Sequence, residues 1–194
     1  MGLLIRVARR LGVSCAVSVL LLTHGGISVG QTAPAPAPAP EYQLKAVFLF
    51  NFAQFVEWPP NVLADPATPL VIGVLGEDPF GSYLDETVHN ETVNEHPLVV
   101  RRFKGVDEIT TCHILFISRR EQARLKQILD GLGGRPVLTV SDADHFAGRG
   151  GMIRFVTEGG RIRLRVNLEA AQAANLTLSS KLLRPAQIVA RGQD

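Results

Sequence analysis

The segment 112–141 constrains the fold of this 194-residue chain more than any other part of the sequence. It opens at 112–118, where the residues between His113 and Ser118 form a short, uniformly apolar run, which is typical of a strand buried on both faces of a parallel sheet. Ser118 and Glu121 then match a helix capping box, and Gly133-Gly134 can end the helix. Residues 136–141 predict a second strand. A strand, a helix and a strand in this order predict a βαβ unit with a right-handed crossover.

The rest of the chain supplies further elements of both kinds. Helices are expected at 41–58, 79–88 and 168–174, the last capped by Asn167, and a final helix should contain Leu182 and Val189. Strands are expected at 70–75, 98–103, 152–156 and 161–166, and the last two should form a hairpin. These elements predict an α/β fold of three layers: a mixed, mostly parallel sheet with helices on both faces and a C-terminal antiparallel hairpin.

The start of the chain is typical of an exported protein. Residues 1–10 contain three arginines and no acid, residues 11–22 are apolar, and small residues precede a cut at Gln31. An uncleaved N-terminal anchor is the alternative, and Arg9-Arg10 leaves the Sec and twin-arginine routes both open. We expect a periplasmic protein with three segments: a cleaved signal peptide at 1–30, an extended Ala/Pro linker at 31–40 and an α/β domain at 41–194.

Charge and cysteine usage limit the partners and crosslinks of the mature chain. Removal of residues 1–30 lowers the basic count from 20 to 17 against 18 acids, which gives a net charge of −1 and leaves no nucleic-acid footprint. Cys112 is the only cysteine left after the cut, so an internal disulfide is ruled out. We expect Cys112 to be a small core residue; the alternative is a redox thiol able to form an intermolecular bond.

Two surfaces are candidates for binding a protein partner. The helix at 41–58 has an apolar arc wider than one core face requires, and we expect Leu49 and Phe50 to face outward. Burial of the whole arc is the alternative. In the strand at 161–166, basic and apolar residues alternate, so one face is a basic ridge that is either solvated or meets an acidic partner or lipid headgroups. The ridge consists of Arg161, Arg163 and Arg165.

No motif for catalysis or metal binding stands out. The mature histidines lack ligand spacing, and the sequence contains no nucleophile elbow, zinc-protease motif or C-x-x-C pair. We therefore expect no catalytic residue, metal or cofactor. Loops at the carboxyl ends of parallel strands can still bind a small ligand. The residues expected to line such a rim are Gly76, Asp78, Ser118, Ser141 and Asp142.

Several segments, in order along the chain, resemble the YfiR family. The opening signature is Tyr42–Ala53 followed by Phe55–Pro59, and weaker matches occur at 76–81, 112–118, 140–142, 146–147, 150–153 and 179–184. The resemblance implies a periplasmic α/β regulator that forms a homodimer. It also implies binding to the periplasmic part of an inner-membrane diguanylate cyclase, or another sensor, which is held inactive. Cysteine redox state affects this role in some members, but Cys112 lacks a partner cysteine here.

Two functions therefore stay open. The first is a non-catalytic periplasmic module that represses a membrane signalling protein in cyclic-di-GMP control. The second is a periplasmic small-ligand receptor or enzyme that uses the strand-end loops. A neighbouring gene for a membrane cyclase or kinase with a periplasmic domain would favour the first.

Overall fold

The computed structural model describes residues 39–194, so the expected signal peptide and nearly all of the linker lie outside the described residues. The elements, in chain order, are α1 (Pro40–Phe55), β1 (Val56–Glu57), β2 (Leu70–Leu75), α2 (Tyr83–Val88), β3 (Thr92–Val93), β4 (His96–Phe103), the 3-10 helix η1 (Val106–Glu108), β5 (Ile114–Ile117), the 3-10 helix η2 (Arg119–Arg124), α3 (Leu125–Leu132), β6 (Leu138–Ser141), β7 (Ile153–Glu158), β8 (Arg161–Val166), α4 (Leu168–Ala173), β9 (Thr177–Leu178), α5 (Ser180–Leu183) and β10 (Ala186–Ile188).

An eight-stranded sheet forms the centre of the domain. Its strand order is β10-β8-β7-β6-β5-β2-β4-β3, and a separate pair joins β1 to β9. The strands β4, β2, β5, β6 and β7 run parallel, whereas β7 with β8 and β3 with β4 are antiparallel. The mixed, mostly parallel sheet, its C-terminal antiparallel hairpin and the βαβ unit of β5, α3 and β6 are therefore confirmed.

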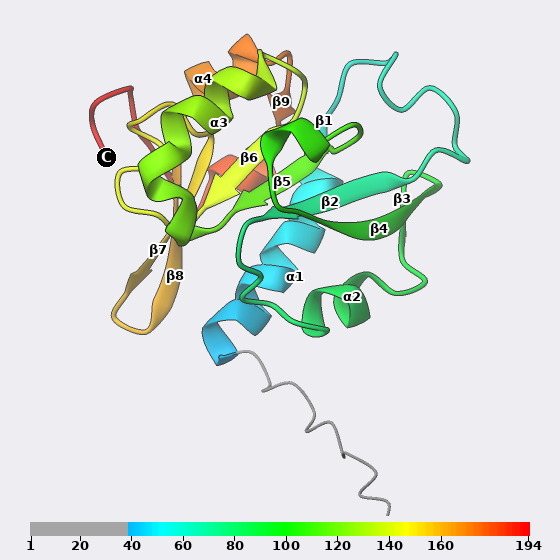
Figure 1. Ribbon diagram of the computed structural model, residues 1–194, viewed down its shortest axis with the longest axis horizontal. Helices are drawn as coiled ribbons and strands as arrows, with labels where there is room; N and C mark the ends of the chain where they lie inside the picture. Colours follow the sequence, from blue (N-terminus) through cyan, green and yellow to red (C-terminus); the bar gives the residue numbers. More distant parts are fainter. Residues whose placement is uncertain (1–38) are drawn as a thin grey trace, which may run out of the picture. The chain divides into compact units, whose positions relative to one another are not determined.

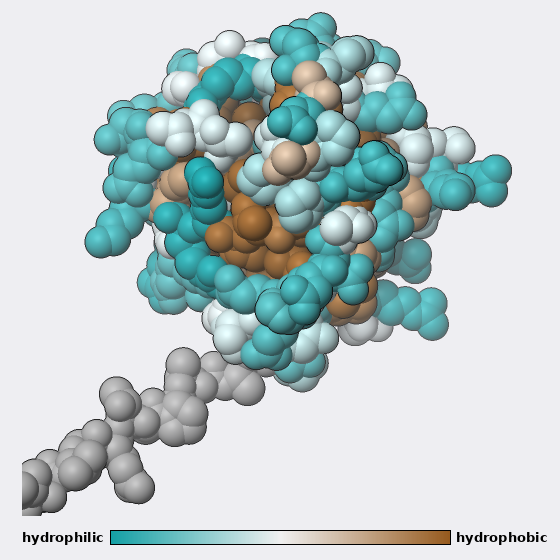
Figure 2. All heavy atoms as spheres, turned by 90° about the vertical axis from the view of Figure 1, so that its right-hand side faces the viewer, coloured by the Kyte–Doolittle hydropathy of each residue, from teal (hydrophilic) through white to brown (hydrophobic). Residues whose placement is uncertain are grey.

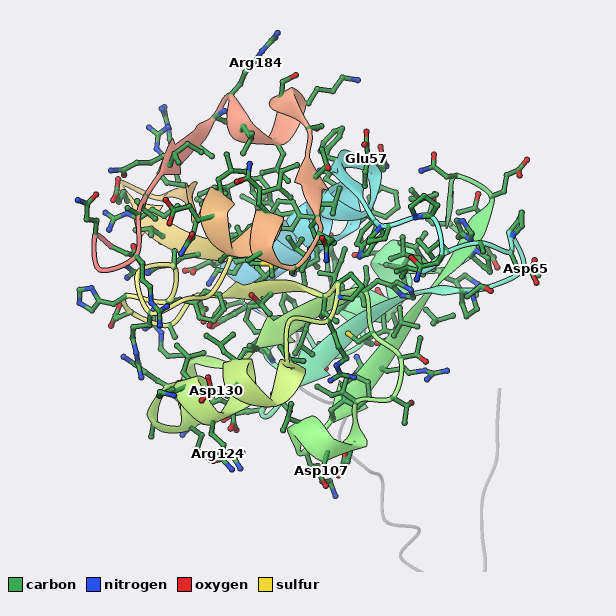
Figure 3. All side chains as sticks on the ribbon, turned by 90° about the horizontal axis from the view of Figure 1, so that it is seen from above. Glu57, Asp65, Asp107, Arg124, Asp130 and Arg184 are labelled. Carbon is green, nitrogen blue, oxygen red and sulfur yellow. The ribbon has the colours of Figure 1, made fainter. Side chains whose placement is uncertain are left out.

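Helices cover both faces of the sheet, which confirms the three layers. Figure 1 shows α1 and α3 on opposite sides of the strands. Every residue of β2, β5 and β6 is buried, and alternate side chains feed two cores. Ile72 and Phe116 pack with α1 and α2, while Leu115 and Ile117 pack with α3. Figure 3 looks at the sheet from above, with α5 and α3 on opposite outer sides of it.

Local turn chemistry acts as the residue types predict. Gly133 ends α3 in the left-handed conformation, at φ 58°. The Asn167 side chain accepts the Ala170 N–H at 3.0 Å and caps α4. Gly159 and Gly160 both have positive φ, which a two-residue hairpin turn between β7 and β8 requires.

The expected capping box at Ser118 is wrong. Ser118 precedes η2 without a side-chain capping bond, and α3 begins only at Leu125. The Glu121 carboxylate accepts a hydrogen bond from Arg124 Nε at 3.0 Å instead of turning back to the cap. The first turns after β5 are therefore 3-10 rather than α-helical.

Three other helix boundaries also differ from expectation. The first helix ends at Phe55, because Val56–Glu57 pairs with β9 as a short strand. The second starts at Tyr83 rather than at Pro79. The expected last helix stops at Leu183, since Pro185 lacks the N–H needed to continue it, and Ala186–Ile188 instead forms β10 beside β8.

Candidate functional site

A buried ion pair joins α1 to the loop after β6. The Lys45 ammonium lies 2.6 Å from Asp142 Oδ2, and the two side chains are only 2% and 4% exposed. The Tyr42 hydroxyl donates a hydrogen bond to the same oxygen at 2.8 Å. At the exposed end of the network, Lys45 also pairs with Glu41 at 2.6 Å. Because buried charges are rare, this network is the first place to look for a function.

The loops after β5 and β6 hold Asp142 in place. The Arg119 guanidinium donates to the Asp142 carbonyl through Nε and Nη2, at 3.2 and 2.9 Å. The buried Ser141 hydroxyl donates to the Ile117 carbonyl at 2.6 Å and accepts the Ala143 N–H at 3.0 Å. These bonds fasten the end of β6 to the end of β5, so the backbone around Asp142 is fixed from both loops.

One carboxylate oxygen of Asp142 is not satisfied. Asp142 Oδ1 is closed off from solvent and has no hydrogen-bond partner among residues 39–194. Leaving a buried acceptor unpaired costs roughly 1–3 kcal/mol, and more for a charged group. Two adjoining hollows of about 390 and 480 Å³ share Tyr42, Arg119 and Asp142 in their walls. Because Oδ1 is closed off from solvent, a ligand in these hollows would instead meet the Tyr42 and Arg119 side chains in their shared wall.

The hollows lie where parallel-sheet proteins usually bind ligands. β2 has β4 on one side and β5 on the other, so the chain order reverses between β2 and β5. The larger hollow is lined by Glu77 after β2 and by Ser118 after β5. Ligands of open α/β sheets bind outside the carboxyl ends of the strands at such a reversal. The position suits a small polar ligand but indicates no particular reaction.

The five rim residues expected from the sequence do not form one site. Ser118 and Asp142 line the larger hollow. Asp78 Oδ1 instead accepts the Phe80 N–H in the turn after β2, and Asp78 Oδ2 accepts a hydrogen bond from Arg102 Nε of β4 at 2.8 Å. Gly76 supplies a backbone turn at φ 87°, and the Ser141 hydroxyl is used within the loops.

Sequence reasoning missed Tyr42, Lys45 and Arg119. A signal existed for Lys45, which is the single basic residue of α1, a helix whose residues are mostly apolar. Burial, and after it the bond to Asp142, raises the pKa of the Tyr42 hydroxyl, so this group stays protonated and remains a donor. The hydrogen bond from Lys45 lowers the pKa of Glu41.

The outward face of α1 differs from the expected one. Leu49 is fully buried in the core, so the expectation that it faces outward is wrong. Phe50 is half-buried and packs against the same core. Leu44 and Val47 are the exposed large apolar residues of α1, at 47% and 36%. The exposed apolar side chains of α1 therefore lie on the Leu44 side of the helix.

The basic ridge of β8 is only partly free. Arg161 and Arg163 are exposed. Arg165 is half-buried, and its guanidinium donates to Asp194 at 3.2 Å and to Glu158 at 3.4 Å. The ridge therefore presents two exposed guanidinium groups, those of Arg161 and Arg163.

Cys112 lies in the core on the α3 side of the sheet, as expected. Its thiol donates to the Ile114 carbonyl at 3.1 Å. Burial raises the pKa of the thiol to about 12, so the reactive thiolate does not form at neutral pH. This geometry gives the redox alternative no support.

Two features of the described part of the chain bear on the class of site. Within residues 39–194, no three His, Cys, Asp or Glu side chains come together in a group that would hold a metal ion. Over the same residues, no helix is both long enough and apolar enough to cross a bilayer.

Comparison with known proteins gives the family. A family model described as YfiR/HmsC-like matches residues 42–187, which is more than half of the chain, and confirms the resemblance seen in the sequence. A search of curated proteins found no match. Members of the family are periplasmic, generally non-catalytic regulators of diguanylate cyclases. The chain belongs to the YfiR/HmsC-like family.

Proposed function

We propose that this protein is a non-catalytic regulator that is exported to the periplasm, with its signal peptide removed. It binds the periplasmic part of an inner-membrane diguanylate cyclase, or another sensor, and holds it inactive, which limits cyclic-di-GMP synthesis. The observation that carries this proposal is the family match over nearly the whole described domain. The absence of a recognisable catalytic constellation in the sequence is compatible with it.

The outer face of α1 is the surface that we assign to the target. Leu44 and Val47 lie one helical turn apart and expose neighbouring apolar side chains, which suit burial against a partner. The Arg161 and Arg163 guanidinium groups form a second surface, which suits an acidic patch on the target or on lipid. A homodimer is part of the proposal, with the α1 face available either to the second copy or to the target.

The test introduces one charge on α1. Leu44→Asp should abolish repression, so cellular cyclic-di-GMP should rise to the level of a deletion strain, while the thermal melt stays unchanged. Gln54→Asp is the matched control, since it places the same charge on an exposed polar position of the same helix. Equal repression by wild type and both variants would remove α1 as the target surface. Light scattering of the same proteins tells whether the change acts on the dimer or on the target.

The second candidate is a receptor for a small polar ligand in the strand-end hollows. The place of the larger hollow favours it, because open α/β sheets bind ligands outside the carboxyl ends of the strands where the strand order reverses. Ser118→Ala removes a hydroxyl from the wall of the larger hollow without touching the Lys45 network. If repression needs a ligand in this hollow, Ser118→Ala should change repression in defined medium. Unchanged repression by this variant would count against the receptor function.

A further inference from the structure

The outer edge of β4 is an open sheet edge. β4 pairs with β2 along residues 98–103, but on its other side β3 covers only His96 and Pro97. The Leu98 N–H is taken by the Glu91 carbonyl at 3.0 Å, and the Lys104 N–H by Glu108 Oε2 at 2.9 Å. Between these two positions the edge has no covering strand.

The alternation of the strand tells which backbone groups are free. The Phe103 carbonyl points to β2, where it accepts the Gly76 N–H at 3.0 Å, while the Leu98 N–H points outward. Because N–H and C=O groups alternate along a strand, Val100 and Arg102 also point outward. Neither backbone has a hydrogen-bond partner among residues 39–194. Such a row of free donors and acceptors is a template for an added strand.

An apolar groove runs beside this edge. A hollow of about 480 Å³ between α2 and β4 is lined by Val88, Leu98 and Val100, with Asp85 and Glu91 among its polar wall residues. Figure 2, which faces this side of the domain, shows an apolar hollow within a polar rim. An added strand would place every second side chain over this groove.

The opposite face of the edge carries a free cation. Arg101 is exposed and forms no ion pair within residues 39–194. Its neighbour Arg102, by contrast, is held by Asp78 at 2.8 Å and by Asp85 at 2.5 Å. Since opposed residues of neighbouring strands share a face, a strand added here would meet apolar groups on one face and a guanidinium on the other.

A second copy of this chain is a poor occupant. In an antiparallel pairing centred on Arg101, the two Arg101 side chains would stand directly opposite each other, which destabilises a sheet. A pairing centred on Val100 would set Arg102 against Leu98, whose N–H is already bonded to Glu91. The β4 edge therefore disfavours pairing with the β4 edge of a second copy but can accept an acidic strand.

We propose that β4 binds an extended segment of a partner protein in which apolar and acidic residues alternate. The segment adds as a ninth strand of the sheet. Its backbone bonds to Val100 and Arg102, its apolar residues cover the groove at Val88 and Leu98, and an acidic residue pairs with Arg101. The interaction is separate from the α1 surface proposed above and does not depend on the identity of the cyclase.

The test uses two synthetic heptapeptides with the mature protein, one alternating Val and Glu and the other alternating Val and Lys. Amide hydrogen exchange is followed by NMR. In the free protein the Val100 and Arg102 amides should exchange fast, and those of Val99 and Arg101 slowly, because the latter face β2. The Val/Glu peptide at millimolar concentration should slow exchange at Val100 and Arg102, and the Val/Lys peptide should not.

Charge reversal tests the recognition. Arg101→Glu should weaken binding of the Val/Glu peptide at least tenfold. Arg163→Glu is the control, since it makes the same change at an exposed position of β8. No protection by either peptide, or equal protection by both, would overturn the proposal. Slow exchange of Val100 and Arg102 without peptide, together with a dimer that Arg101→Glu disrupts, would assign the edge to a second copy and overturn it too.

Discussion

The Lys45–Asp142 pair allows a sharp test of what burial does to a charge. We expect Lys45→Met to destabilise the domain strongly, because methionine keeps the aliphatic part of the side chain and removes only the ammonium. Asp142 would then be a buried carboxylate with a single donor, the Tyr42 hydroxyl. Removing one member of a buried pair costs about 3–5 kcal/mol.

The chain contains a matched control. Lys126 and Asp130 on α3 form an ion pair with the same separation, 2.6 Å, but their side chains are 85% and 64% exposed. Figure 3 labels Asp130 on this outer helix. Lys126→Met should cost no more than about 0.5 kcal/mol, since water screens such a pair. The distance is equal in the two cases, so the pairs differ in their burial and in the further bonds of the buried pair to Glu41 and Tyr42.

Urea unfolding and thermal melts measure both effects. At roughly 2–4 °C per kcal/mol for a domain of this size, Lys45→Met should lower Tm by about 6–20 °C. The double variant Lys45→Met with Asp142→Leu should recover most of this loss, because the uncompensated charge is gone. Similar small losses in the Lys45 and Lys126 variants would refute the reasoning, as would a double variant no more stable than Lys45→Met.

Three further predictions concern single residues. Leu49→Ala should cost about 2–5 kcal/mol in urea unfolding, whereas Leu44→Ala should stay within about 0.5 kcal/mol; equal costs would contradict the orientation of α1. Cys112 should react with a thiol reagent only as fast as the protein unfolds, and rapid reaction of the native protein would contradict its burial. Burial lowers the pKa of His113 to about 4 from the model-peptide value of 6.5, and its Nδ1 accepts the Val71 N–H at 2.9 Å. As pH falls, the unfolded chain therefore binds this proton before the folded chain does, so the free energy of unfolding should fall between pH 6.5 and about 4. His113→Gln should reduce this dependence of the free energy of unfolding on pH. An unchanged dependence in the variant would argue against this assignment.

The parts of the fold that follow from local signals could be predicted from the sequence. Uniform apolar runs identified β2 and β5 because a strand covered on both faces has no polar side to show. Gly159-Gly160 identified the hairpin because both residues need positive φ. Each of these signals is read within a few residues, and no distant partner is needed to interpret it.

The parts of the fold that depend on distant partners could not be predicted from the sequence. Val56–Glu57 is a strand only because β9 lies beside it, and Ala186–Ile188 only because β8 does. The hydrophobic pattern of α1 has no narrow stripe, so it does not tell Leu44 from Leu49. Only part of the candidate site could be predicted from the sequence. Ser118 and Asp142 directly follow predicted strands, but Lys45 reaches the site from a helix 97 positions earlier in the chain.

The ion pair also explains which face of α1 is left outside. The bond from Lys45 to Asp142 favours the same rotation of the helix about its axis as the burial of Leu49 does. In that rotation Leu49, one turn further on, enters the core, and Leu44 and Val47 face solvent. A buried pair of this kind adds little stability over apolar residues of similar size, but it can specify one arrangement among several. The double variant that removes both charges should therefore regain its Tm and still repress poorly, because α1 would no longer be held in the rotation that presents Leu44. Full repression by that variant would show that packing alone sets the helix.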